Sequence, residues 1–154
     1  MNEGKRWEAN IRRSIPGIIR LYDSTNGYSG VCNPCDFIYY RYPYMFMIEA
    51  KSVKKSKIYW TAITDNQHEQ LAYYDTIYGV NSIILIEFRT EQECYALPYK
   101  VLQRLRDEGE KGLSINKARE LDDVYLLPTE YKRVNCDISL DEFNLILERI
   151  GNSI

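Results

Sequence analysis

The hydrophobic residues of this chain form runs and alternations typical of a buried sheet. The longest apolar runs, MFMI at residues 45–48 and IILI at residues 83–86, carry apolar side chains on both faces of an extended chain. Such runs predict strands that lie inside a sheet and are buried on both sides. The predicted strands are residues 18–22, 35–40, 44–53, 80–88, 93–97 and 124–127.

Apolar residues recur at helical spacing in the segments around these strands. After Asn2, a residue type that often caps helices, Trp7 and Ile11 lie four residues apart. Thr64 and Gln67 have the spacing of a capping box. The predicted helices are residues 2–14, 64–78, 98–109, 113–121 and 139–151. The order α-β-β-β-α-β-β-α, followed by a tail with one more helix, predicts an α/β fold with a mixed sheet and helices on both faces.

An acidic pair with a lysine accompanies the most strongly apolar strand. Glu49-Ala50-Lys51 follows MFMI, and Asp36 begins the preceding strand. Residues two apart in a strand point to the same face, so Glu49 and Lys51 project together. Glu-x-Lys also occurs at residues 3–5 and 130–132, where a solvated charge pair explains it. The buried context of the middle copy favours a functional site there.

Two carboxylates beside a lysine suit a divalent cation that works next to a phosphate. Asp36 and Glu49 are predicted ligands of Mg²⁺, which takes one or two carboxylates and keeps several waters. Lys51 is predicted to position the attacking water and to stabilise charge on phosphorus. Gln67 is predicted to contact a phosphate or a water beside the metal, although helix capping explains it equally well. Glu8 is a third candidate ligand, with an exposed surface position as its alternative.

Composition and charge change this picture little. The hydrophobic content of 45% and the charged content of 27% are ordinary for one globular domain of 154 residues. The net charge of −2 argues against indiscriminate nucleic-acid binding and leaves local binding open. The basic residues predicted to contact nucleic acid are Arg12, Arg13, Lys54, Lys55 and Lys57.

Three further features bear on location and on metal chemistry. No segment is long and apolar enough to cross a membrane, and the charged N-terminus lacks a signal peptide's apolar core, so a cytoplasmic protein is expected. Cys32 and Cys35 form a C-x-x-C pair without the further ligands that structural zinc needs, so reduced thiols are expected. His68, the single histidine, is expected to be a surface residue.

Several segments in order resemble the RecU family of Holliday junction resolvases, especially short phage-type members. They are GKRWEANIRRSIP, PCDF with IEAKS, NQHEQL, and SIILIEF with ECYALP, all within residues 4–100. In NQHEQL, Gln70 stands where the family has a histidine. The element order also resembles the α-β-β-β-α-β core of the restriction-endonuclease-like fold, in which the acid and Glu-x-Lys lie on the second and third strands.

The resemblance implies a homodimer that binds four-way DNA junctions and makes paired nicks with Mg²⁺, or with Mn²⁺ in its place. It maps Asp36, Glu49 and Lys51 onto catalytic positions and Gln67 onto a supporting one. It also implies that the backbone carbonyl of Ala50 is a metal ligand. We therefore expect a single nuclease domain over residues 1–154, acting in the cytoplasm of its cell, or of the host if it is phage-encoded.

Two departures from the family pattern leave other functions open. The family carries a long basic stalk before the aspartate, whereas only residues 23–33 occupy that region here. Ile38 and Tyr39 stand where the family often has a second acid. The alternatives are a nuclease of the same fold that acts on other DNA in restriction, repair or replication, and a DNA-binding module without activity.

Overall fold

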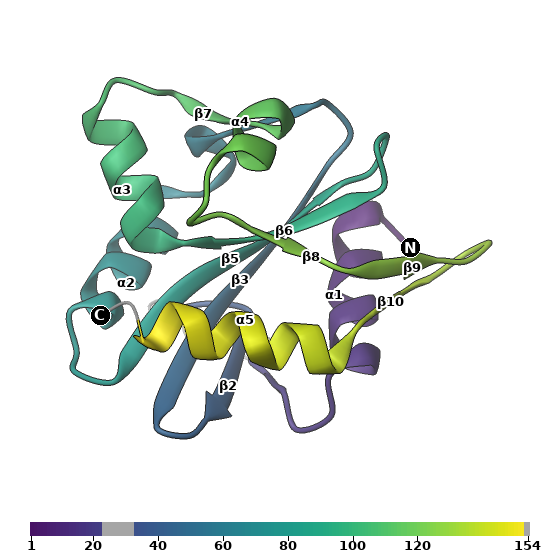
Figure 1. Cartoon of the computed structure of the whole chain (residues 1–154), viewed down its shortest axis with the longest axis horizontal. Coiled ribbons are helices and arrows are strands. Elements are labelled where there is room, and N and C mark those ends of the chain that lie inside the picture. Colours follow the sequence, from purple (N-terminus) through teal and green to yellow (C-terminus); the bar gives the residue numbers. More distant parts are fainter. Residues whose placement is uncertain (23–32, 153–154) are drawn as a thin grey trace, which may run out of the picture.

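The computed structural model describes residues 1–22 and 33–152, which form a central six-stranded sheet flanked by helices (Figure 1). The strand order across the sheet is β1-β2-β3-β5-β6-β8. The bounds of these strands are β1 Ile19–Arg20, β2 Phe37–Arg41, β3 Tyr44–Val53, β5 Val80–Phe88, β6 Glu93–Pro98 and β8 Tyr125–Leu127. The predicted loop at residues 23–30 and Cys32 lie outside the described residues.

The strand directions follow from the connections between the strands. β1, β2 and β3 pair antiparallel in this order, and so do β5, β6 and β8. β3 and β5 pair in parallel, because the connection between them contains the crossover helix α2 (Asp65–Asp75). This topology confirms the predicted mixed sheet and its α-β-β-β-α-β, restriction-endonuclease-like core.

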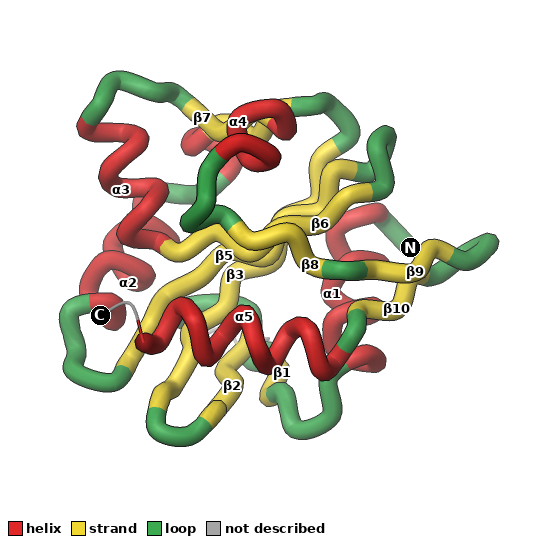
Figure 2. Tube along the Cα trace, in the orientation of Figure 1, coloured by secondary structure: helices red, strands yellow, loops and turns green. Residues whose placement is uncertain are grey.

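Two hydrophobic cores lie on opposite faces of the sheet. Alternate residues of β5 contribute to each, with Ile83 and Leu85 on one side and Ile84 and Ile86 on the other. The helices α1 (Glu3–Ser14) and α5 (Leu140–Asn152) pack on the first face. The helices α2, α3 (Tyr99–Asp107) and α4 (Ile115–Glu120) pack on the second (Figure 2). No helix in the described part of the chain has the length and hydropathy needed to cross a bilayer.

Four short strands and one helical turn were not predicted from the sequence. β4 (Lys57–Tyr59) pairs with β7 (Gly112–Ser114), and the 3-10 turn η1 (Trp60–Ala62) follows β4. β9 (Thr129–Tyr131) and β10 (Cys136–Ile138) form a hairpin at one side of the sheet (Figure 2). Strands of three residues are too short for a periodic pattern, and their pairing depends on distant segments.

Several predicted boundaries shift by a few residues. α2 ends at Asp75 rather than residue 78, and Gly79 provides the positive φ of 80° before β5 begins. The segment 113–121 divides into the end of β7 and helix α4. The predicted first helix is confirmed, and the Asn2 side chain caps it by accepting from the Lys5 N–H over 2.8 Å.

Candidate active site

The Glu-x-Lys motif lies where β3 loses one of its two neighbours. The β2–β3 ladder ends at the pair Phe37 and Ile48, with one further bond from the Asp36 N–H to the Ile48 carbonyl at 3.0 Å. From Glu49 onward, β3 pairs with β5 on one side only. The side of β3 that faces β2 up to Ile48 therefore has no strand partner from Glu49 onward, and we call this side the open edge.

Asp36 is fixed at this edge by the backbone of Ala50. The Ala50 N–H donates to Asp36 Oδ2 over 2.9 Å. Since the N–H and C=O of one strand residue point to the same side, the Ala50 carbonyl also faces the open edge. The two predicted carboxylates and this carbonyl are thus brought together, although 13 positions separate Asp36 from Glu49 in the sequence.

Glu49 is almost completely buried, with 2% of its surface exposed. Burial raises the pKa of its carboxyl to about 9, and the negative charge of neighbouring Asp36 adds to the shift. The Lys51 ammonium, 3.8 Å from Glu49 Oε1, opposes the shift without cancelling it. A buried carboxylate beside a second acid favours a bound cation.

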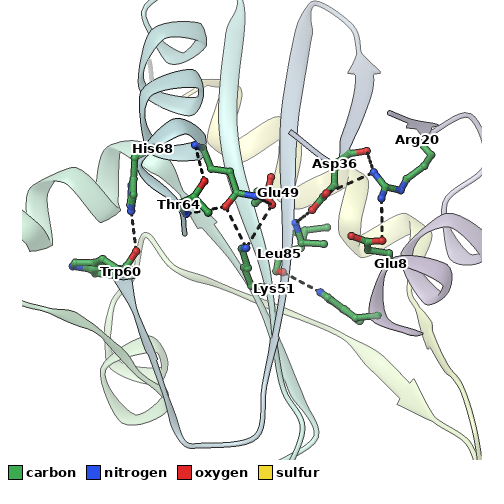
Figure 3. A network of polar contacts seen from close by, with 12 residues as sticks. Glu8, Arg20, Asp36, Glu49, Lys51, Trp60, Thr64, His68 and Leu85 are labelled. Atoms are coloured by element: carbon green, nitrogen blue, oxygen red, sulfur yellow. Dashed lines mark hydrogen bonds and ion pairs between the residues drawn. The ribbon is translucent and has the colours of Figure 1, made fainter. Parts of the chain in front are cut away.

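Gln67 joins the acid and the lysine of the motif. Its Nε2 donates to Glu49 Oε1 over 3.0 Å, and its Oε1 accepts from Lys51 Nζ over 3.3 Å. The capping box also forms, because the Gln67 N–H donates to Thr64 Oγ1 and the Thr64 N–H donates to Gln67 Oε1. Capping and site contact, weighed as alternatives from the sequence, therefore occur together at the start of α2 (Figure 3).

Glu8 approaches the site from α1, on the side of Asp36 that is away from Lys51 (Figure 3). Its neighbour Trp7 is fully buried and donates from Nε1 to the Leu85 carbonyl over 3.0 Å, which fixes α1 against β5. Burial and the Asp36 carboxylate raise the Glu8 pKa. Glu8 is therefore half-buried beside the acidic pair rather than fully exposed.

Arg20 is the site residue that sequence reasoning missed. Its Nη2 donates to Glu8 Oε2 over 3.1 Å, and its Nη1 lies 3.6 Å from Asp36 Oδ1. Arg20 Nη1 also donates to the Asp36 carbonyl over 2.9 Å. The only signal in the sequence is an arginine in the first short strand, whose pairing with the start of β2 brings it beside Asp36.

The predicted nucleic-acid-binding residues lie on two sides of the site. Lys54, Lys55 and Lys57 follow β3 and line a shallow cavity of about 370 Å³. Arg12 is exposed on α1 and donates to the Tyr22 hydroxyl over 2.6 Å. Arg13 instead donates to the Cys136 carbonyl over 2.8 Å and pairs with Asp137, which ties α1 to β10.

His68, predicted to be a surface residue, has an intermediate exposure. Its ring is partly buried, with Nδ1 2.8 Å from the Tyr99 hydroxyl and Nε2 2.9 Å from the Trp60 carbonyl. Both ring nitrogens are therefore occupied in joining α2 to α3 and to the turn after β4, and Figure 3 shows the contact with Trp60. This arrangement gives His68 a structural role.

The donor set fits Mg²⁺ in kind and number. Within residues 1–22 and 33–152, no three His, Cys, Asp or Glu side chains converge as a ready-made metal cage. Mg²⁺ does not need such a cage, because one or two carboxylates suffice while several waters stay bound. Asp36 and Glu49 provide two carboxylates at one edge, and together with Glu8 they outnumber the two cations beside them, Lys51 and Arg20.

Comparison with known proteins adds a family to this geometry. A structure of Hjc, a Holliday junction resolvase from Archaeoglobus fulgidus, aligns with a TM-score of 0.46 and 20% identity over 63% of this chain and 78% of that chain. No curated protein matches the sequence. The family model described as Recombination protein U (RecU) matches residues 18–134, a range that contains every predicted site residue from Asp36 to Gln67 but not Glu8. Because this match covers well over half of the sequence, the chain belongs to the RecU family.

Proposed function

We propose that this RecU-family protein is a metal-dependent endonuclease that cuts branched DNA, with four-way junctions as its substrate in recombination. The observation that carries the proposal is the cluster of Glu49, Lys51 and Gln67, joined by side-chain contacts of 3.0–3.8 Å beside Asp36. The cluster lies where β3 has no β2 partner, and the side chains of Lys51 and Asp36 remain partly exposed there. Membership of a family described as a recombination protein supports the choice of a recombination intermediate.

We propose Mg²⁺ as the metal, with Mn²⁺ able to replace it, and Asp36, Glu49 and the Ala50 carbonyl as its ligands. Glu8 is a further ligand in this proposal if Arg20 releases it. When bound, the metal supplies Lewis-acid activation of the scissile phosphate and of a water. The raised pKa of Glu49 supports the assignment, because a neighbouring divalent cation stabilises the ionised carboxylate that burial disfavours.

The protein residues orient the groups around the metal and neutralise charge. The Lys51 ammonium, held by Gln67, provides a positive charge that stabilises the charge developing on phosphorus. Gln67 keeps Lys51 and Glu49 in fixed rotamers, since each end of its amide binds one of them. The Ala50 N–H keeps Asp36 directed towards the edge.

We propose a homodimer as the active form. Resolving a four-way junction requires one cut in each of two strands, and the described residues contain a single cluster of this kind. In this proposal residues 1–154 form one nuclease domain, and the lysines after β3 contact DNA phosphates. Sedimentation or light scattering at micromolar concentration measures the subunit number directly, and a monomer at all concentrations would count against the dimer.

The segment before Asp36 is short, with only residues 23–33 in the region where the family carries a basic stalk. A nuclease that acts on DNA other than four-way junctions is therefore the second candidate. A panel of labelled four-way, three-way, flap and linear DNA with Mg²⁺ separates the two. Preference for the four-way substrate supports the proposal, whereas preference for linear ends or flaps would assign the same chemistry to other DNA. Binding without cleavage of any substrate would leave a non-catalytic DNA-binding module.

A further inference from the structure

A groove of about 320 Å³ lies between α1 and the segment that follows β1, next to the candidate active site. Its lining consists of Lys5, Glu8, Ala9, Arg12, Arg20 and Tyr22. We propose that this groove binds the phosphate backbone of the DNA strand beside the phosphate that is cut. The inference rests on the proposed function, and only Arg12 is among the residues that the sequence predicts to contact nucleic acid.

One stripe of α1 forms a wall of the groove. Lys5, Ala9 and Arg12 are spaced by four and three residues, so they follow one face of the helix. At 1.5 Å per residue, Lys5 and Arg12 are about 10 Å apart along the helix axis. The axial rise between phosphates of one DNA strand is about 3.4 Å, so the two cations contact different phosphates. The small Ala9 between them leaves space for a sugar-phosphate backbone to approach the helix.

The two cations of this stripe are not neutralised by neighbouring acids. Arg6 pairs with Glu3 and Arg13 pairs with Asp137, on other faces of the same helix. Within the part of the chain that the structure describes, neither Lys5 nor Arg12 forms an ion pair with a carboxylate. Their charges are therefore available to an anion in the groove.

Tyr22 holds the arginines of the groove in place. The Arg12 and Arg20 guanidinium carbons lie 5.9 and 5.4 Å from the centre of its ring, within the range of cation-π attraction. Arg12 Nη1 also donates to the Tyr22 hydroxyl over 2.6 Å. Arginines whose planes are fixed in advance lose less entropy when they bind a phosphate.

Arg20 connects the groove to the candidate active site. It contacts Glu8 in the groove and Asp36 at the open edge of β3 (Figure 3). A strand whose scissile phosphate lies at Asp36 therefore continues past Arg20 into the groove. The lysines after β3 line another cavity, and in this proposal that cavity contacts a different part of the same DNA.

The test measures binding of the full chain to a four-way junction in EDTA, by fluorescence anisotropy over a range of salt. The variant Lys5→Ala/Arg12→Ala removes the two free cations. The control Lys100→Ala/Arg149→Ala also removes one lysine and one arginine, but from exposed positions outside the groove. Tyr22→Leu removes the aromatic platform, and Tyr22→Phe keeps its ring.

We expect the groove variant to raise Kd about tenfold, and to flatten the salt dependence by about one or two phosphate contacts, whereas the control changes little. Tyr22→Leu is expected to weaken binding several-fold and Tyr22→Phe less. Equal effects of the groove and control variants, or an unchanged salt slope, would overturn the groove assignment. If only the groove assignment is wrong, the wild type still cleaves the junction with Mg²⁺. If the proposed function is wrong, the wild type does not cleave it.

Discussion

Gln67 Nε2 donates to the buried carboxylate of Glu49 over 3.0 Å, while the other end of the same amide accepts from Lys51. Glu49 and Lys51 already share a face of β3 because they are two residues apart. Gln67 fixes the positions of both side chains on this face, since moving either charged group breaks a hydrogen bond. The start of α2 is therefore part of the site, in addition to its role in capping the helix.

We predict that Gln67→Leu lowers DNA cleavage about 10- to 100-fold, the usual effect of removing a group that orients a ligand residue. Leucine fills a similar volume but provides neither the donor to Glu49 nor the acceptor for Lys51. Single-turnover rates with saturating Mg²⁺ measure the loss at the chemical step.

Thr64→Ala is the matched control for Gln67. It removes the hydroxyl that caps α2 and leaves the Gln67 contacts with Glu49 and Lys51 available. We expect it to lower the free energy of unfolding by about 1 kcal/mol with little loss of cleavage by the folded protein. An equal loss of cleavage in Thr64→Ala and Gln67→Leu would assign Gln67 to capping alone.

Glu49→Gln is predicted to stabilise the metal-free protein at high pH while it abolishes cleavage. The pKa of Glu49 is raised from 4.5 to about 9 in the folded state, so the folded protein holds a proton that the unfolded chain releases. Stability from this group is therefore present below about pH 4.5 and is lost as pH rises towards about pH 9. Thermal unfolding in EDTA across this range measures the effect, and we expect glutamine to gain about 1–3 kcal/mol at the alkaline end.

Two controls separate this effect from a general change in charge. Glu69→Gln removes an exposed acid from α2 and is expected to leave the pH dependence unchanged. Addition of Mg²⁺ is expected to raise the stability of the wild type at alkaline pH and to leave the stability of Glu49→Gln unchanged. Parallel curves of stability against pH for the wild type and Glu49→Gln in EDTA would contradict the raised pKa of the buried Glu49 carboxyl.

His68→Phe is predicted to destabilise the fold by about 1–3 kcal/mol, because it leaves the Trp60 carbonyl and the Tyr99 hydroxyl without their partner. Cleavage per folded molecule is expected to stay near the wild-type value, since His68 does not contact Glu49 or Lys51 in the described structure. Tyr99→Phe removes one of the same two bonds and is expected to have a smaller effect. Denaturant unfolding combined with active-site titration checks both variants. A His68→Phe protein that is stable but inactive would give His68 a catalytic role.

Local sequence signals predicted the elements that carry most of the site. The apolar run before Glu49 predicted the central strand β3, because few other structures bury both faces of a short segment. Thr64 and Gln67 predicted the start of α2, since a capping box depends only on residues within one turn. The positions of Asp36, Glu49 and Gln67 in the element order then followed from the fold class.

The contacts that the sequence did not reveal all join distant segments. Arg20 lies 16 positions before Asp36 and reaches it because β1 pairs with β2. The β4–β7 pairing requires glycine at position 112, where a Cβ atom would lie 2.2 Å from the Ile58 carbonyl oxygen. Neither residue differs locally from an ordinary arginine or an ordinary loop glycine. Such contacts depend on tertiary structure rather than on local propensity or periodicity.

Cleavage of a four-way junction with each strand labelled measures the proposed nuclease activity itself. We predict that the wild type makes paired nicks in opposite strands with Mg²⁺ and none in EDTA. Asp36→Asn keeps an acceptor for the Ala50 N–H but loses the ligand charge, so we expect cleavage to fall about 100-fold or more while junction binding stays within about threefold. A wild type that leaves the junction intact with both Mg²⁺ and Mn²⁺ would rule out the junction nuclease, and an Asp36→Asn variant that cleaves as fast as the wild type would rule out Asp36 as a metal ligand.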